Sequence, residues 1–561
     1  MKNNIFTKVV WVALIVISVL SCDTQNLRDL DIPKYLLTED KVDFTWLYSN
    51  IIVSHSRRYI GGFPVRKEGH YLKYYATYSN LGLPGATNQF DRDINDNYWG
   101  ISESNRGAYN SEIVMAKKLE DVLVKEDNPD MAYNLAIVRA LKVASFQRLT
   151  DFYGDIPYSD AARLAIDGWE YSKPKYDSQE VIYDDMLKTL KEAAEVLNTP
   201  NAGAAAATWI NGDLIYAGNV TKWKGFVNSL MLRLAMRISY VDATKAREYA
   251  ELAIRNGVIV SNADNFNLPC SASTSPDERN TYGAWLAGEG GGDPERYIKL
   301  GEYFVNFLKD MNDPRMKIIF GGRLNPDVTA IVAADMSNYW RDVSKWNWDL
   351  TQALGMQHGT STNPEPGIAE YHHKYTSPNP FLFRTTRPLE LLTASEMLLL
   401  IAEAATNGWN TPGYTAESAY EAGIKANMSL LTGYGELIKS DVPSATQPNM
   451  DISASEMDAY IAAHSLGTGA AAKTRIAEEM WITMYMNPLE GWFNVRRMNL
   501  KLPVNNSTIP GFSMPRRNAY PENERSNNID NLNEVLNAKG WDRLTREEEV
   551  QQRVWWDVNT N

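Results

Sequence analysis

The sequence predicts a mostly α-helical protein in which paired helices form a scaffold around a long, loop-rich region. Apolar residues recur at helical spacing in two blocks of the chain, at about 111–257 and 388–487. The segment between the blocks, about 258–387, lacks this periodicity and is rich in proline, glycine and tryptophan. Apolar residues at every third or fourth position mark amphipathic helices, whereas long aperiodic segments in compact proteins are usually functional loops or disordered.

The N-terminus predicts a lipoprotein signal peptide over residues 1–21. Lys2 and Lys8 flank an apolar run, Val9–Leu20, which is too short to span a bilayer. The run ends in Val19-Leu20-Ser21-Cys22, similar to the bacterial lipobox, in which the cysteine thiol carries diacylglycerol. The alternative is an ordinary signal peptide followed by an incidental cysteine. No later stretch approaches the roughly 18 apolar residues of a membrane span, so we expect residues 22–561 to form one domain held at a membrane by lipid.

Both periodic blocks are expected to fold as helix pairs joined by short turns, which is typical of tetratricopeptide-like packing. Asn256-Gly257 reads as a helix stop at the end of the first block. The first block predicts helices at 111–124, 129–149, 178–197, 222–238 and 243–256, and the second at 395–405, 416–431, 453–464 and 473–486.

Composition excludes some partners. A net charge of −13 argues against nucleic acid and anionic lipid surfaces, because phosphate binding needs concentrated lysine and arginine. Hydrophobic residues make up 44% of the chain, enough for a sizeable core. Besides Cys22 there is one cysteine, Cys270, so no internal disulfide is expected in the mature chain.

The chain lacks the sequence signatures of common catalytic and metal sites, so we expect no catalytic residue, no cofactor and no metal. Two carboxylates could in principle hydrolyse a glycoside, and Glu396 and Glu403 lie seven residues apart on one predicted helix. The simpler interpretation is that buried arginines neutralise these acids. The candidate partners are Arg387, Arg475, Arg496 and Arg497.

A partial calcium-loop pattern begins at Asp91. Oxygen-bearing side chains at Asp91, Asp93 and Asn95 fit the first ligand positions, but Asp96 stands where glycine belongs and Glu103 comes one place late. A polar turn closed by side-chain hydrogen bonds accounts for the same residues without a metal.

Aromatic residues in the loops are the best candidates for a binding site. The C–H face of a sugar packs well on an aromatic ring, while amides and carboxylates bind its hydroxyls. Each of these residues could equally be a core or loop-anchoring side chain. The candidate glycan-binding residues are Trp99, Trp285, Tyr339, Trp340, Trp346 and Trp348.

Several segments resemble the SusD/RagB family of nutrient-binding outer-membrane lipoproteins. Their order and spacing carry the resemblance more than any one of them does. They are Arg148–Ser159, Asn312–Arg315, Arg387–Ala404, Arg475–Trp481, Glu490–Arg497 and Met514–Arg525.

The resemblance implies a cell-surface, non-enzymatic protein, lipid-anchored in the outer membrane, that captures oligosaccharides or polysaccharides. It also implies a partner, a SusC-like TonB-dependent transporter, to which the ligand is passed. The family's glycan-binding aromatics do not lie in its recognisable motifs, so no ligand residue is carried over. Two other functions stay open: a partner protein of the transporter that handles peptide or other cargo, and a glycosidase on a helical frame.

Overall fold

The structure, a computed structural model, describes residues 44–58, 67–76, 98–99, 108–109, 111–273, 275, 278–286, 298–325, 345–358, 373–441, 449–503 and 514–560. The chain divides into two compact units, residues 1–47 and 48–561. Of the first unit only residues 44–47 are described, as the start of helix α3 (Phe44–Val53). The predicted signal peptide and Cys22 lie outside the described residues.

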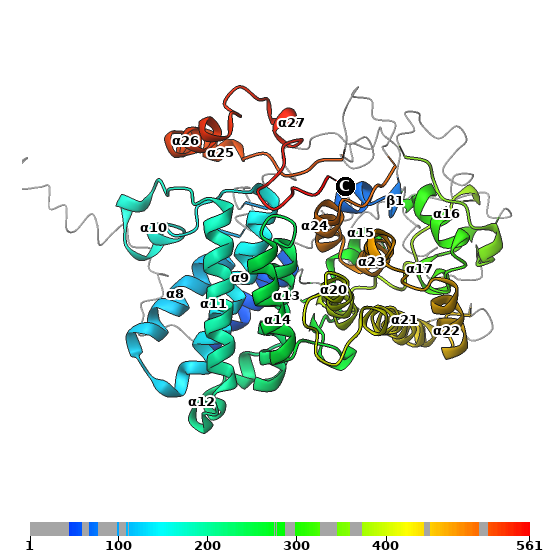
Figure 1. Ribbon diagram of the computed structural model, residues 1–561, viewed down its shortest axis with the longest axis horizontal. Helices are drawn as coiled ribbons and strands as arrows, with labels where there is room; N and C mark the ends of the chain where they lie inside the picture. The colour runs from blue at the N-terminus through cyan, green and yellow to red at the C-terminus, as the bar shows by residue number, and fades with distance from the viewer. Residues whose placement is uncertain are drawn as a thin grey trace, which may run out of the picture. The chain divides into compact units, whose positions relative to one another are not determined.

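The first predicted block folds into a row of helices that pack against one another in chain order (Figure 1). They are α8 (Glu112–Glu126), α9 (Ala132–Tyr153), α11 (Gln179–Asn198), α13 (Val220–Arg237) and α14 (Ala243–Asn256). Side chains cap several N-termini, as Ser178, Asn219 and Asp242 do by accepting a backbone N–H three residues on. Gly257, at φ 97°, ends α14 as the sequence indicates.

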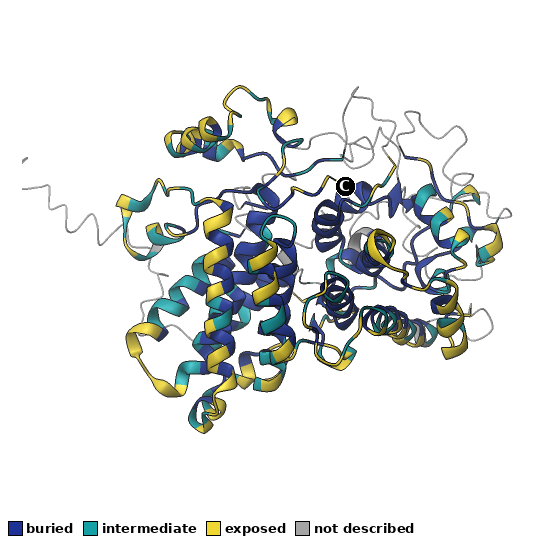
Figure 2. Ribbon diagram, viewed as in Figure 1, coloured by how far each residue is buried: buried dark blue, intermediate teal, exposed yellow. Residues whose placement is uncertain are grey.

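The second block packs around α20 (Ala394–Thr406), which contacts α21 (Ala416–Asp441), α23 (Gly469–Thr483) and, from the first block, α13. Residues 394–404 of α20 are all buried, so this helix is dark along nearly its whole length in Figure 2, whereas α11 and α14 show exposed outer faces. The remaining helices of the block are α22 (Ala454–Ala463) and α24 (Pro488–Met498). The mostly helical fold of paired helices is thus confirmed.

Shorter elements lie within the first block, in the middle region and toward the chain ends. Three two-stranded antiparallel sheets pair β1 with β3, β2 with β6 and β4 with β5. The strands are β1 (Tyr75–Ala76), β2 (Phe266–Leu268), β3 (Lys299–Leu300), β4 (Arg323–Leu324), β5 (Trp346–Asn347) and β6 (Leu389–Leu392). The short α-helices are α5 (Glu68–Tyr71), α10 (Arg163–Ile166), α12 (Ala202–Ala207), α15 (Thr281–Leu286), α16 (Glu302–Asp310), α17 (Met316–Ile319), α25 (Glu522–Asn527), α26 (Ile529–Lys539) and α27 (Arg546–Glu549).

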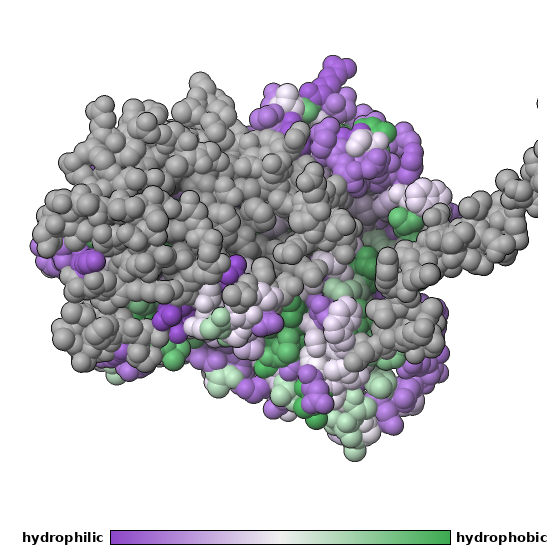
Figure 3. Space-filling view, turned by 180° about the vertical axis from the view of Figure 1, so that it is seen from behind, coloured by the Kyte–Doolittle hydropathy of each residue, from purple (hydrophilic) through white to green (hydrophobic). Residues whose placement is uncertain are grey.

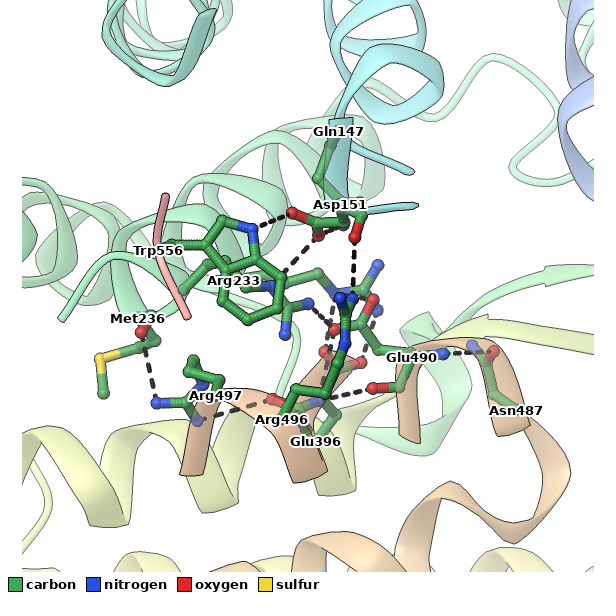
Figure 4. A network of polar contacts seen from close by, with 12 residues as sticks. Gln147, Asp151, Arg233, Met236, Glu396, Asn487, Glu490, Arg496, Arg497 and Trp556 are labelled. Atoms are coloured by element: carbon green, nitrogen blue, oxygen red, sulfur yellow. Dashed lines mark hydrogen bonds and ion pairs between the residues drawn. The ribbon is translucent and has the colours of Figure 1, made fainter. Parts of the chain in front are cut away.

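The two blocks meet at a buried network of charges and hydrogen bonds (Figure 4). Asp151 at the end of α9 accepts a hydrogen bond from the Trp556 indole at 2.7 Å and pairs with Arg237 of α13 at 3.2 Å. Arg237 also binds Glu490 of α24. The Arg496 guanidinium donates to the backbone oxygen of Asp151 at 2.8 Å. Since all these side chains are buried, each charge depends on its partners for stability.

Glu396 and Glu403 are held by arginines. Glu403 forms two hydrogen bonds with Arg497, each 2.7 Å long, and both side chains are 1% exposed. Glu396 pairs instead with Arg233 of α13, which was not among the four predicted partners. The prediction was therefore right for Arg497 and incomplete for Glu396. Bidentate pairing of both acids favours the structural interpretation over the glycosidase.

The segment 148–159 has the architecture that its sequence indicates. Helix α9 ends at Gly154, whose φ of 80° and ψ of −119° are open to glycine but strained for other residues. The chain then turns, and Asp155 accepts a hydrogen bond from the Gln179 N–H at 3.0 Å and pairs with Lys539 at 2.9 Å. This motif therefore joins α9, α11 and the C-terminal helices.

No helix among the described residues is both long and apolar enough to cross a membrane. On the face seen in Figure 3, the described apolar residues form green areas between polar ones.

Candidate functional site

The described part of the candidate ligand region centres on the two-residue hairpin arms β4 and β5. Arg323 pairs in register with Asn347, and Leu324 with Trp346. The arms can approach closely because Gly322 lacks a side chain. A Cβ added there would lie 2.9 Å from both the Asn347 oxygen and the Trp346 Cβ. The connection between the arms includes Tyr339 and Trp340, which lie outside the described residues.

A polar cluster covers the outer side of this hairpin, and we call it the hairpin cluster: Arg323, Asn347, Asp349 and Gln352. The Gln352 carbonyl oxygen accepts hydrogen bonds from Arg323 at 2.7 Å and from the Asn347 amide at 3.3 Å. Its amide nitrogen donates to Asp349 at 2.9 Å. The hairpin cluster therefore holds a guanidinium, two amides and a carboxylate in a fixed arrangement, and two of its members, Asn347 and Asp349, flank Trp348 in sequence.

Asp349 is held as an anion at the surface. Hydrogen bonds from the Thr351 hydroxyl at 2.7 Å and the Thr351 N–H at 3.0 Å lower the pKa of its carboxyl group. Gln352 adds a third donor. A carboxylate beside amides and a guanidinium can bind the hydroxyl groups of a sugar from several directions.

The predicted tryptophans differ in accessibility. Trp348 is half-buried, and its ring centroid lies 6.5 Å from that of Phe381. Trp346 is only 5% exposed. Strand β5 ends at Asn347, so strand alternation does not place Trp348 on the same side as Trp346. Of the two, Trp348 is the less buried, and it is flanked in sequence by the polar residues Asn347 and Asp349.

Trp99 occupies a different environment. It is 2% exposed and packs edge-on against Tyr153 at 4.9 Å and Tyr520 at 6.2 Å, with Tyr109 at 5.1 Å. Trp99 is thus a core side chain, the alternative that the sequence analysis gave for each of the candidate aromatics. Trp285 lies in α15, but its side chain is outside the described set.

The hairpin cluster was not predicted from the sequence, because polar residues are common in loops. Asn347 and Asp349 flank Trp348, and that neighbourhood was the only available signal. Most of the partial calcium loop at 91–103 lies outside the described residues. Among the residues that are described, no group of three or more histidine, cysteine or acidic side chains is placed to hold a metal ion.

Paired helices that carry a loop region with an aromatic and polar surface define a ligand-binding scaffold protein. Comparison with known protein families identifies the family. The family model for SusD-like proteins, described as starch-binding and associating with the outer membrane, matches residues 65–521. The chain therefore belongs to the SusD-like family, which confirms the resemblance seen in its motifs.

Solved structures agree with this assignment. A chitin-binding protein is 26% identical, with a TM-score of 0.73, and the match covers 92% of this chain and 100% of that one. A chitin-binding SusD homologue from Flavobacterium johnsoniae is 22% identical, with a TM-score of 0.64, over 92% and 98% of the two chains. A SusD homologue from Bacteroides thetaiotaomicron is 22% identical, with a TM-score of 0.65, over 93% and 100%. No curated protein matches the chain.

Proposed function

We propose that this protein captures oligosaccharides or polysaccharides at the cell surface and passes them to a SusC-like TonB-dependent transporter in the outer membrane, without cleaving them. The observation that carries the proposal is the family match over residues 65–521, because that family is described as starch-binding and outer-membrane associated. The half-buried Trp348, flanked in sequence by Asn347 and Asp349 of the hairpin cluster, supports it, since an aromatic residue near amide and carboxylate groups is suited to a sugar ring.

Chitin oligosaccharides are the first ligands to test. The solved structure at 26% identity is described as a chitin-binding protein. An acetamido group both donates and accepts hydrogen bonds, and the amides of Asn347 and Gln352 could supply both functions.

The experiment is affinity electrophoresis of a form lacking residues 1–22, through native gels that contain single polysaccharides, with soluble chitin derivatives and starch in the panel. We expect retardation by one or two polymers, which stay at full length after incubation. Retardation by none would overturn the glycan proposal and favour the peptide-cargo alternative. Shortened polymer would favour the glycosidase.

Trp348→Ala is the matching variant. We expect it to lower the affinity for the retarding polymer at least 10-fold, on the basis that stacking and burial of one aromatic ring contribute about 1.5–3 kcal/mol. The control is Trp169→Ala, because Trp169 is 81% exposed and lies on another surface element, residues 169–171. Equal retardation of Trp348→Ala and the parent protein would remove Trp348 from the site.

The transfer to a transporter needs its own test. We expect the lipidated protein to co-purify with a TonB-dependent transporter from outer membranes of the native host. Isolation of the protein from those membranes without any transporter would contradict this part of the proposal and leave glycan capture standing.

A further inference from the structure

A cleft lies along helix α23, and none of its lining residues belongs to the β4–β5 hairpin. Its volume is about 680 Å³, within the range of pockets that enclose small ligands. Small side chains of α23, including Ala470, Thr474 and Ala477, line it. We call it the α23 cleft. Three of its lining residues, Ala477, Glu478 and Trp481, fall in the segment Arg475–Trp481, for which the sequence predicts no ligand contact.

One wall of the α23 cleft is aromatic. Tyr303 and Phe307 are four residues apart on α16, so they share one face of that helix. Their ring centroids are 6.1 Å apart, and both rings pack on Trp481 of α23, at 5.8 and 5.2 Å. Trp481 is itself fixed by a hydrogen bond from its indole to the Leu72 oxygen at 2.9 Å. The two half-buried rings are therefore held in place by a rigid base.

The opposite wall comes from the ends of α13 and α24. Tyr240 follows α13, and Met498, Asn499 and Leu500 follow one another where α24 ends. Asn499 has a left-handed backbone, with φ at 54°, and this turns the chain sharply at the edge of the cleft. Apolar surface and side-chain amides thus alternate along this wall.

The charged groups of the cleft leave a positive excess. Glu478 is paired with Arg475 at 3.1 Å. Within the described part of the chain, neither Lys473 nor Lys501 forms an ion pair, although the whole protein carries a net charge of −13. The Lys473 ammonium lies 5.9 Å from the centre of the Tyr240 ring. Two unpaired ammonium groups in one cleft of an acidic protein favour an anionic ligand.

We propose that the α23 cleft is a second binding site, for a short acidic oligosaccharide whose carboxylates contact Lys473 and Lys501 while its rings pack on Tyr303 and Phe307. Aromatic walls, the Thr474 hydroxyl and the Asn499 amide suit the C–H faces and hydroxyls of a uronic acid. The site lies on different elements from Trp348. It extends the proposed function by a second ligand class and does not depend on the first site.

The test is isothermal titration of the form lacking residues 1–22 with trigalacturonate, compared with neutral maltotriose and a triglutamate peptide. We expect saturable binding of trigalacturonate near one equivalent, weakened at least 10-fold in Lys473→Met/Lys501→Met and also weakened by added salt. Ala470→Trp should abolish binding, because the larger side chain fills the cleft. Since Ala470 is exposed, we expect this variant to have the same thermal unfolding midpoint as the parent protein. The control Lys173→Met/Lys188→Met removes two exposed lysines elsewhere and should bind like the parent.

Four outcomes would overturn the proposal: no binding of trigalacturonate, equal binding of maltotriose, equal binding of triglutamate, or unchanged affinity in the double lysine variant. None of them bears on retardation by gels of neutral polysaccharides, which reports the first site. Loss of retardation in Trp348→Ala likewise says nothing about the α23 cleft. The two proposals therefore fail separately.

Discussion

At the scale of single residues, the molecule depends on charges that are buried in pairs. Arg497 and Glu403 are each 1% exposed and are joined by two 2.7 Å hydrogen bonds. Burying both charges costs hydration, and their geometry offsets that cost only while both are present. Removing one partner of such a pair is therefore expected to lower the free energy of unfolding strongly.

We expect Glu403→Gln to lower the free energy of unfolding by roughly 3–5 kcal/mol, because it leaves the Arg497 guanidinium buried without a counter-charge. Urea denaturation followed by circular dichroism measures this. The matched control is Glu192→Gln, which breaks an exposed pair with Lys188 and should change stability by about 0.5 kcal/mol or less. Similar decreases in the free energy of unfolding for Glu403→Gln and Glu192→Gln would show that burial does not determine how much such a pair contributes.

Glu390 on β6 gives a second residue-scale prediction. It is fully buried, and burial raises the pKa of its carboxyl group to about 7, although a hydrogen bond from Tyr434 opposes the shift. The folded state then holds a proton that the unfolded state has already released. Stability falls as pH rises from about 4.5 to about 7, and the loss is complete above that range.

Glu390→Gln removes this titration. We expect the variant to gain about 1–3 kcal/mol relative to the parent between pH 5 and pH 8, measured as the difference between their urea unfolding curves at each pH. Taking the difference cancels the other titrating groups, which both proteins share. A difference that does not change with pH would contradict the raised pKa.

At the scale of elements, most helices could be read from the sequence. The predicted helices at 178–197 and 243–256 correspond closely to α11 and α14, because an amphipathic stripe, an N-cap side chain and a C-terminal stop agree in both. Helix α24 was missed. All of its residues are buried, Glu490, Arg496 and Arg497 included, so charged side chains do not mark an exposed face of this helix. Helix α21 runs ten residues beyond its predicted end at 431.

Site residues were harder to predict than helices, for a physical reason. An aromatic side chain in a loop has the same composition signal whether it packs inward, as Trp99 does at 2% exposure, or keeps an accessible ring, as Trp348 does. Only tertiary contacts decide between the two. The pair Tyr303 and Phe307 did carry a readable signal, two aromatics at helical spacing, but the surrounding region was interpreted as loop.

Two glycines allow a prediction about helix ends and interiors. Gly154 ends α9 with φ at 80°, whereas Gly225 lies inside α13, where an added Cβ would meet only the Ile259 side chain at 3.5 Å. We expect Gly154→Ala to lower stability by about 1–3 kcal/mol and Gly225→Ala to raise it by about 0.5–1 kcal/mol. Thermal or urea unfolding checks both. We expect the two substitutions to change the free energy of unfolding in opposite directions. Equal changes would contradict the roles of Gly154 as a helix end and Gly225 as a helix-interior residue.

At the scale of the whole molecule, the two helical blocks are joined by the charges around Asp151, and the ligand region lies between them in sequence. Asp151 of the first block is bound by Arg496 of the second and by Trp556 near the C-terminus. The scaffold is thus closed by contacts between residues far apart in the chain. Such a frame can hold variable loops in place without depending on their sequence.

The predicted lipid anchor at Cys22 determines where the whole protein is located. Because the sequence offers a lipobox-like segment at residues 19–22 and only one other cysteine, the anchor can be tested by exchanging one thiol at a time. In cells fed labelled palmitate, we expect the parent and Cys270→Ala to take up label and sediment with outer membranes. Cys22→Ala should take up none and leave the membrane fraction, because a lipid chain contributes about 0.8 kcal/mol per buried methylene and nothing comparable replaces it. Membrane-bound, unlabelled Cys22→Ala would mean that the transporter, and not lipid, holds the protein at the surface.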